Sequence, residues 1–184
     1  TKILPDDVRK ITGKQILDEI GLKPLELDIF DGSPPCSAFS TSGKRDKGWG
    51  DKVKKYSDVS QSNVEDLFFE YIRILDELKP KCFIAENVAG LTVGTAKGYL
   101  NEILRLLRAC HYHVEARVLD AKWLGVPQTR NRLIIVGIHE SLYKPEMQGK
   151  LHPKPINKIV TLGEAFEGLC FTEADRIETD ISRF

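Results

Sequence analysis

Residues 67–88 read LFFEYIRILDELKPKCFIAENV, and this stretch decides the fold. Its first half carries apolar residues at the spacing of one helix face, namely Leu67, Phe68, Tyr71, Ile72, Leu75 and Leu78. Pro80 ends that pattern, and Cys82–Glu86 is then a short apolar run typical of a buried strand. A helix that leads directly into a buried strand is the repeating unit of α/β folds.

The same alternation continues in both directions along the chain. Upstream, Leu27–Asp31 predicts another buried strand, which ends at Gly32 and a double proline. Thr12 and Gln15 have the spacing of a capping box, which predicts the start of a short helix. Downstream, the patterns predict a helix, two strands and a short helix, at Tyr99–Ala109, Val114–Val118, Arg132–Ile138 and Thr161–Phe166. We therefore expect an α/β domain with a mostly parallel sheet.

Length and composition indicate a single globular domain. The chain has 184 residues, of which 41% are hydrophobic and 29% charged. No apolar run is long enough to cross a bilayer, and the first residues do not resemble a signal peptide. The four cysteines are too far apart for a zinc site and too few for a disulfide framework: Cys36, Cys82, Cys110 and Cys170. We expect a cytoplasmic protein without metal.

Charge alone does not predict a partner, because the formal net charge is zero. The local distribution is more informative, since six basic residues and two acids lie between Gly43 and Lys55. They belong to a long polar stretch from Ser40 to Ser62, of the kind that serves as a functional loop or is disordered.

Two reactive side chains follow neighbouring strands. Cys36 comes shortly after the strand ending at Asp31, and Glu86 ends the strand that begins at Cys82. Ligands of open α/β sheets bind beyond the carboxyl ends of the strands, so a thiol and a carboxyl there suggest nucleophilic catalysis with a nearby acid. The simpler alternatives are a small buried cysteine and a surface carboxylate.

Three segments resemble motifs of the cytosine-C5 DNA methyltransferase family, in order and in spacing. Residues 31–40, Asp-Gly-Ser-Pro-Pro-Cys-Ser-Ala-Phe-Ser, are similar to its nucleophile loop. Residues 86–88 match its Glu-Asn-Val motif, and residues 128–132 match its Gln-x-Arg-x-Arg motif. The resemblance runs from near Asp7 to about Gly168. It implies a partial Rossmann-like fold that uses S-adenosylmethionine.

The resemblance also implies roles for individual residues. The Cys36 thiolate would add to carbon 6 of a flipped cytosine, so that carbon 5 can accept a methyl group. Glu86 would protonate ring nitrogen 3, Arg132 would contact the oxygen on carbon 2, and Arg130 would brace the site or a phosphate. Asn87 is interpreted as structural.

The same resemblance implies which residues contact the cofactor and which contact the nucleic acid. Residues expected to contact S-adenosylmethionine are Asp7, Val8, Pro35 and Leu67. The resemblance implies double-stranded DNA as the partner, and a target base inside a duplex must then be flipped out. Residues expected to contact it are Ser40, Lys44, Arg45, Lys47 and Gln128.

The chain departs from the family pattern at both ends. No glycine-rich cofactor turn precedes Cys36, and no large target-recognition region follows the third motif. Ser37 stands where many members have Gln. We therefore expect a catalytic core that is incomplete, over residues 1–168. Residues 169–184 are expected to be a tail or the start of a target-recognition region.

Three alternatives remain open at this point. The chain could act on cytosine in transfer RNA, or it could be a nucleic-acid-binding remnant without catalysis. A thiol hydrolase would need a histidine base near Cys36, and none of the four histidines has a suitable context. We expect a monomer, and in a bacterium we expect association with the nucleoid and a place in restriction-modification.

Overall fold

A computed structural model describes residues 3–4, 6–35, 67–94 and 96–169 of the chain. The described residues form four helices and four strands, which alternate as far as β3: α1 (Gly13–Ile20), β1 (Ile29–Gly32), α2 (Leu67–Leu78), β2 (Cys82–Val88), α3 (Ala96–Ala109), β3 (Tyr112–Asp120), β4 (Asn131–His139) and α4 (Leu162–Ala165). Short 3₁₀ turns lie at Ala89–Thr92, Ala121–Leu124 and Pro145–Met147. The predicted α/β class is confirmed.

The four strands form one sheet in the order β1-β2-β4-β3. β1 and β2 are parallel, whereas β4 runs antiparallel to both of its neighbours, β2 and β3. Three of the four described strands, β1, β2 and β3, therefore run in the same direction, as expected of a mostly parallel sheet, and β4 is the reversed one. Residues 121–130 join β3 to β4 without a crossover helix, and so short a connection reverses the direction of the chain.

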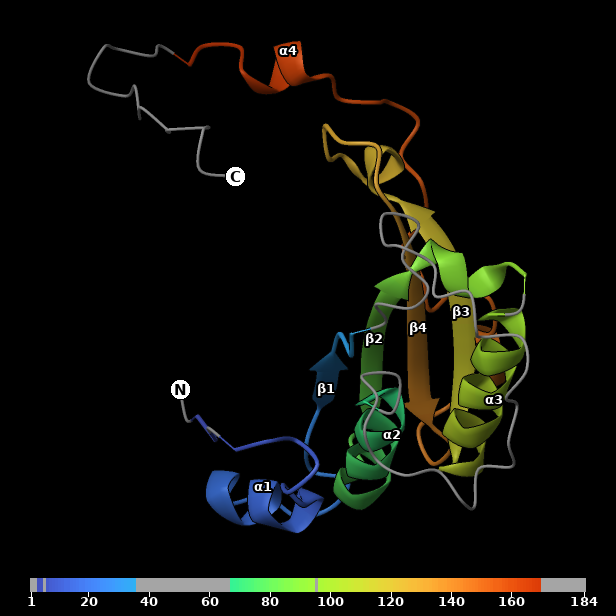
Figure 1. Cartoon of the computed structure of the whole chain (residues 1–184). Helices are drawn as coiled ribbons and strands as arrows, with labels where there is room; N and C mark the ends of the chain where they lie inside the picture. The colour runs from blue at the N-terminus through green and yellow to red at the C-terminus, as the bar shows by residue number, and fades with distance from the viewer. Residues whose placement is uncertain (1–2, 5, 36–66, 95, 170–184) are drawn as a thin grey trace, which may run out of the picture.

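One face of the sheet holds the main hydrophobic core. Phe83 and Ala85 on β2 and Leu133 and Ile135 on β4 point to this face, and all four are at most 1% exposed. Helices α2 and α3 lie side by side against it (Figure 1). Gly137 on β4 leaves room for the Phe83 ring, because a Cβ there would lie 2.1 Å from it.

The first helix packs outside this core, against α2. Thr12 and Gln15 form the predicted capping box, and Gly21 ends α1 in the left-handed conformation with φ 71°. Leu17 on α1 joins Ile74 and Leu78 on α2 in a second, smaller apolar cluster. The sequence patterns for this helix are confirmed.

The remaining elements differ from the predictions mainly at their ends. α3 begins three residues before Tyr99, and β2 continues to Val88. α4 starts from Thr161, whose hydroxyl and Glu164 form a second capping box. This helix projects away from the sheet at the top of Figure 1. No helix among the described residues is long and apolar enough to span a membrane.

Candidate active site

The carboxyl ends of β1 and β2 and the amino end of β4 lie at the same end of the sheet, which we call the rim (Figure 1). This follows from the pairing directions, because β1 and β2 are parallel and β4 runs the opposite way. Glu86 and Asn87 near the end of β2 therefore come close to Arg132 near the start of β4. Two of the three sequence motifs meet here.

Glu86 and Arg132 form an ion pair across adjacent strands. Arg132 Nε lies 2.6 Å from Glu86 Oε1. Arg132 stands opposite Val88 in the ladder, so Glu86, two residues earlier on β2, is its diagonal neighbour on the same face. The side chains are 28% and 35% exposed, which leaves the pair accessible to a ligand.

Asn87 ties the Glu-Asn-Val motif to the loop that leads to Cys36. Its side chain is buried, with 3% exposed, on the face opposite to that of Glu86. Asn87 Nδ2 donates to the carbonyl oxygen of Pro34 at 3.1 Å, and its Oδ1 accepts from Val88 N at 2.8 Å. These bonds are those expected of a residue that holds two loops together.

Gly32 allows β1 to approach α2 closely. A Cβ at this position would lie 2.5 Å from the Tyr71 ring, so a larger residue would displace that ring. The Tyr71 hydroxyl donates to the carbonyl oxygens of Phe30 and Ile84, at 3.3 and 3.2 Å, on the two parallel strands. The end of β1, and with it the beginning of the cysteine loop, is held by these contacts.

Several predicted site residues lie outside the described residues. They are Cys36, Ser40, Lys44, Arg45 and Lys47. Pro35, the residue before Cys36, is described and exposed. The roles given to these residues stay predictions.

The third motif begins in the link between β3 and β4. Gln128 and Arg130 are exposed there, just before β4 begins at Asn131. The backbone N–H of Arg130 donates to Asp120 Oδ1 at 3.1 Å, and Ala121 N donates to the carbonyl oxygen of Arg130 at 3.1 Å. Asp120 was missed by sequence reasoning. An Asp at a strand end, followed by a turn, is nevertheless a recognisable signal for side-chain bonds to the backbone.

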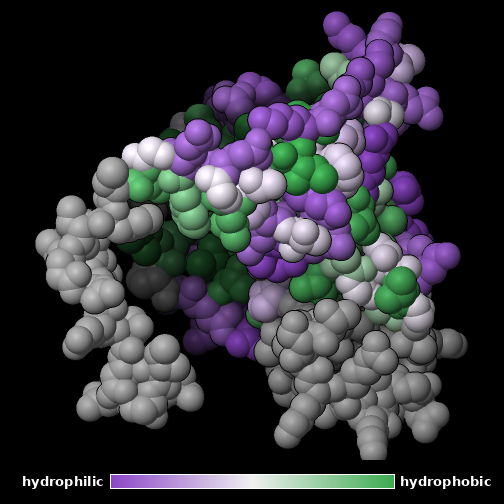
Figure 2. Space-filling model, turned by 90° about the horizontal axis from the view of Figure 1, so that it is seen from above, coloured by the Kyte–Doolittle hydropathy of each residue, from purple (hydrophilic) through white to green (hydrophobic). Residues whose placement is uncertain are grey.

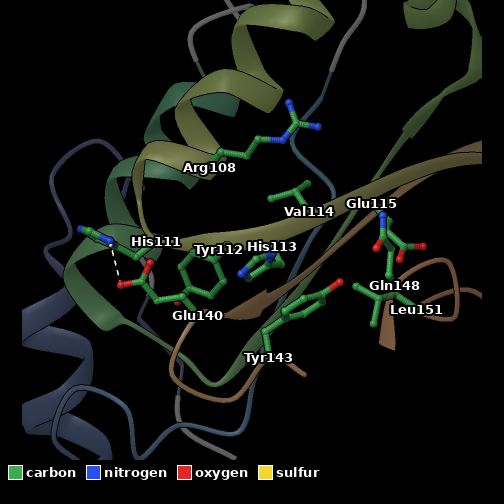
Figure 3. Close-up of a pocket in the computed structure, with 10 residues that line it drawn as sticks. All are labelled: Arg108, His111, Tyr112, His113, Val114, Glu115, Glu140, Tyr143, Gln148 and Leu151. Carbon is green, nitrogen blue, oxygen red and sulfur yellow. Dashed lines mark ion pairs between the residues drawn. The ribbon is translucent and has the colours of Figure 1, made fainter. Parts of the chain in front are cut away.

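A separate groove lies at the other end of β3 (Figure 3). It is lined by residues that include Arg108, His113, Glu140 and Tyr143. His113 stacks on Tyr143 with ring centroids 3.7 Å apart, and His111 pairs with Glu140 at 3.1 Å. The two histidines are therefore engaged with different partners. No group of His, Cys, Asp and Glu within the described ranges could hold a metal ion.

The family model of C-5 cytosine-specific DNA methylases matches residues 3–181. The chain belongs to this family. The Type II methyltransferase M.SacI of Streptomyces achromogenes is 37% identical over 137 residues, which are 74% of this chain and 33% of that protein. The Type II methyltransferase M.MthTI of Methanothermobacter thermautotrophicus is 39% identical over 155 residues, which are 80% of this chain and 41% of that protein.

Solved structures support the fold. A prophage-encoded E. coli protein assigned as a DNA modification methyltransferase has a TM-score of 0.64 at 24% identity, over 91% of this chain and 42% of that one. The partial Rossmann-like methyltransferase fold is thereby confirmed. The chain spans about a third of the length of the first two curated relatives.

The four residues expected to contact the cofactor, Asp7, Val8, Pro35 and Leu67, are exposed or half-buried. Hydrogen bonds from Arg9 lower the pKa of the exposed Asp7 carboxyl to about 2, so Asp7 is ionised and can accept from an adenine amino group. Pro35 is exposed and Leu67 half-buried, so both can still offer apolar surface. Val8 packs its side chain on the α1–α2 cluster instead.

Helix α2 holds the Asp7–Val8 segment in place. Arg73 Nη2 donates to the carbonyl oxygens of Val8 and Ile11, at 3.1 and 2.9 Å. Glu77, one turn further along α2, accepts from Gly13 N at the start of α1. Arg73 is a second residue that sequence reasoning missed. Asp7 itself forms an ion pair with Arg9.

Proposed function

We propose that this chain is the catalytic part of an enzyme that methylates carbon 5 of cytosine in double-stranded DNA. The observation that carries the proposal is the Glu86–Arg132 ion pair at the rim, 2.6 Å from atom to atom and still accessible. A carboxyl group beside a guanidinium matches the edge of a cytosine ring. The guanidinium can donate to oxygen 2, and the carboxyl can accept from the exocyclic amino group and, when protonated, donate to nitrogen 3.

The base would enter by opening this ion pair. Arg132 would turn one N–H group from Glu86 to the oxygen on carbon 2. Glu86 would then face nitrogen 3 and the exocyclic amino group of the same base. Because nitrogen 3 is an acceptor, Glu86 must carry a proton to donate to it.

The nucleophile is assigned to Cys36. Its thiolate would form a bond to carbon 6 while nitrogen 3 gains the proton of Glu86, which gives a neutral enamine. Carbon 5 would then accept the methyl group, which S-adenosylmethionine supplies when bound. Loss of the proton from carbon 5 to a base, with release of the thiolate, restores the double bond between carbons 5 and 6. Nitrogen 3 returns its proton to Glu86, which leaves neutral 5-methylcytosine. The Asn87–Pro34 hydrogen bond supports this assignment because it joins the cysteine loop to the strand of Glu86.

Nucleic-acid contacts are assigned to the stretch that follows Cys36. Ser40, Lys44, Arg45 and Lys47 would meet phosphates, which gives affinity that depends on salt but not on sequence. Gln128 would lie beside the flipped base. The base must leave the duplex for Cys36 to reach carbon 6.

The proposal is tested by methyl transfer with labelled S-adenosylmethionine. The longest polypeptide that contains this chain is incubated with double-stranded DNA or with transfer RNA, and the nucleosides are then separated. Labelled 5-methylcytosine in DNA alone is the expected result. Label in transfer RNA alone would show that the substrate is transfer RNA and not DNA. Label in neither nucleic acid, from a protein that still binds DNA, would favour a nucleic-acid-binding remnant without catalysis.

A further inference from the structure

The link between β3 and β4 carries Gln128 and Arg130 of the third motif, and the carboxylate of Asp120 joins the two ends of this link. Asp120 Oδ1 accepts from Arg130 N at 3.1 Å and from Lys122 N at 3.2 Å. The backbone adds a parallel bond, from Ala121 N to the carbonyl oxygen of Arg130 at 3.1 Å. The two ends of residues 121–130 are therefore tied together at the point where β3 stops.

This closure lies next to the first rung of the β3–β4 ladder. Asp120 pairs with Asn131, and Leu119 pairs with Arg132. Arg132 is thus two residues after Arg130, whose backbone N–H group donates to Asp120. In a strand, a slip of one residue turns every following side chain to the other face of the sheet. Arg132 would then lose Glu86, which lies on one face only.

We propose that Asp120 is a positioning residue, which fixes the residue at which β4 begins and thereby holds Arg132 against Glu86. The inference rests on the proposed function, because it concerns the arginine assigned to the base. It adds a residue outside the three motifs, on a different strand from both members of the pair.

The position of the acceptor oxygen, and not the charge, is what this role requires. Asp120 also faces Lys122 Nζ at 3.3 Å, but the lysine side chain is 31% exposed, and exposed ion pairs contribute little. Asn offers an acceptor oxygen at the same place without the charge. Glu keeps the charge but moves the oxygens by one methylene group.

Glu115 provides a matched control on the same strand. Its carboxylate also accepts from the backbone of a later segment, Gly149 N at 2.5 Å, but it lies towards the opposite end of β3. Shortening Glu115 to Asp moves its oxygens by one methylene group, as Asp120→Glu does. Each substitution disturbs one hydrogen bond between a β3 carboxylate and the backbone of a later segment. Only the bond of Asp120 holds a residue of the third motif, Arg130.

The experiment compares Asp120→Asn, Asp120→Glu and Glu115→Asp in the longest polypeptide that contains this chain. Hydrogen exchange at the Arg130 amide and the kcat and KM for methyl transfer to DNA are measured for each. Asp120→Glu should speed exchange at Arg130 about tenfold or more and lower kcat about tenfold, with KM for DNA changed less than about threefold. Asp120→Asn and Glu115→Asp should stay within about threefold of the unaltered protein in both measurements.

Three results would overturn the inference. They are an unaltered Arg130 exchange rate in Asp120→Glu, an Asp120→Asn variant as impaired as Asp120→Glu, and a Glu115→Asp variant with an equal loss of kcat. If the unaltered protein transfers no methyl group, the proposed function fails. The exchange rates of the three variants then still decide whether Asp120 fixes the start of β4.

Discussion

Glu86 and Arg132 lie diagonally across two antiparallel strands, with Arg132 Nε 2.6 Å from Glu86 Oε1. Neither side chain is fully buried, so the pair contributes little to folding, on the order of 1 kcal/mol or less. Its accessibility fits a pair that exchanges one partner for a ligand.

Replacing Arg132 should therefore damage activity far more than stability. Arg132→Ala is expected to lower kcat/KM for methyl transfer by about a hundredfold or more, because the base loses its donor and Glu86 loses its partner. The free energy of unfolding, measured with urea, should fall by no more than about 1 kcal/mol. A loss of activity explained by unfolded protein would contradict this assignment.

Asn87 should matter for stability, in contrast to Arg132. Asn87→Ala removes a buried amide that bonds Pro34 and Val88, and it leaves the Pro34 carbonyl without that donor. We expect a loss of about 1–3 kcal/mol in the free energy of unfolding. Asn101, which is exposed on α3, is the control, and Asn101→Ala should leave the urea midpoint almost unchanged.

Two glycines should respond to alanine in opposite directions. At Gly137 a Cβ would lie 2.1 Å from the Phe83 ring, whereas at Gly98 on α3 nothing lies within 4 Å. Gly137→Ala should destabilise the fold by about 1–3 kcal/mol, and Gly98→Ala should stabilise it by about 0.5–1 kcal/mol. Thermal unfolding of the two variants measures both effects. Equal shifts of the two midpoints would show that the sheet can absorb the extra methyl group.

Acid should destabilise the fold before the carboxylates titrate. Burial lowers the pKa of His139 and of His152 below the ordinary value of 6.5. As the pH falls below that value, these histidines bind protons in the unfolded chain but stay neutral in the folded chain. The free energy of unfolding therefore decreases from its value at neutral pH. Urea unfolding at pH 7.5, 6.5 and 5.5 should show this decline, and His152→Phe should make it shallower. A free energy of unfolding that rises over this range would contradict the prediction.

Sequence patterns predicted the local structure well. The capping box at Thr12 depends on two residues three apart, so it was predicted from the sequence. The short helix after Thr161 was predicted as well, and the structure adds a capping box there. The insertion of β4 between β2 and β3 is not visible in the sequence, because strand order depends on which edges meet in space. The helix between β2 and β3 favours a parallel crossover, and these two strands do run in the same direction. The short link after β3 carries no sequence signal that β4 returns between them in the opposite direction.

The candidate site could be predicted in part. Glu86 and Arg132 were assigned from motifs, and the ladder brings them together as expected of one site. Asp120 and Arg73 were missed because each acts on backbone groups, at Arg130 and at Val8 and Ile11 respectively. Every residue offers the same backbone groups, so the sequence does not identify the partner of such a side chain, even where an Asp at a strand end signals that a bond of this kind can form.

The most direct test of the account is covalent capture of the target base. The longest polypeptide that contains this chain, and its Cys36→Ser variant, are mixed with S-adenosylmethionine and DNA that contains 5-fluorocytosine, which cannot lose the group on carbon 5. The account predicts a protein–DNA adduct that survives a denaturing gel and is absent from the variant. An adduct that persists in Cys36→Ser, or methyl transfer to DNA without any adduct, would contradict it.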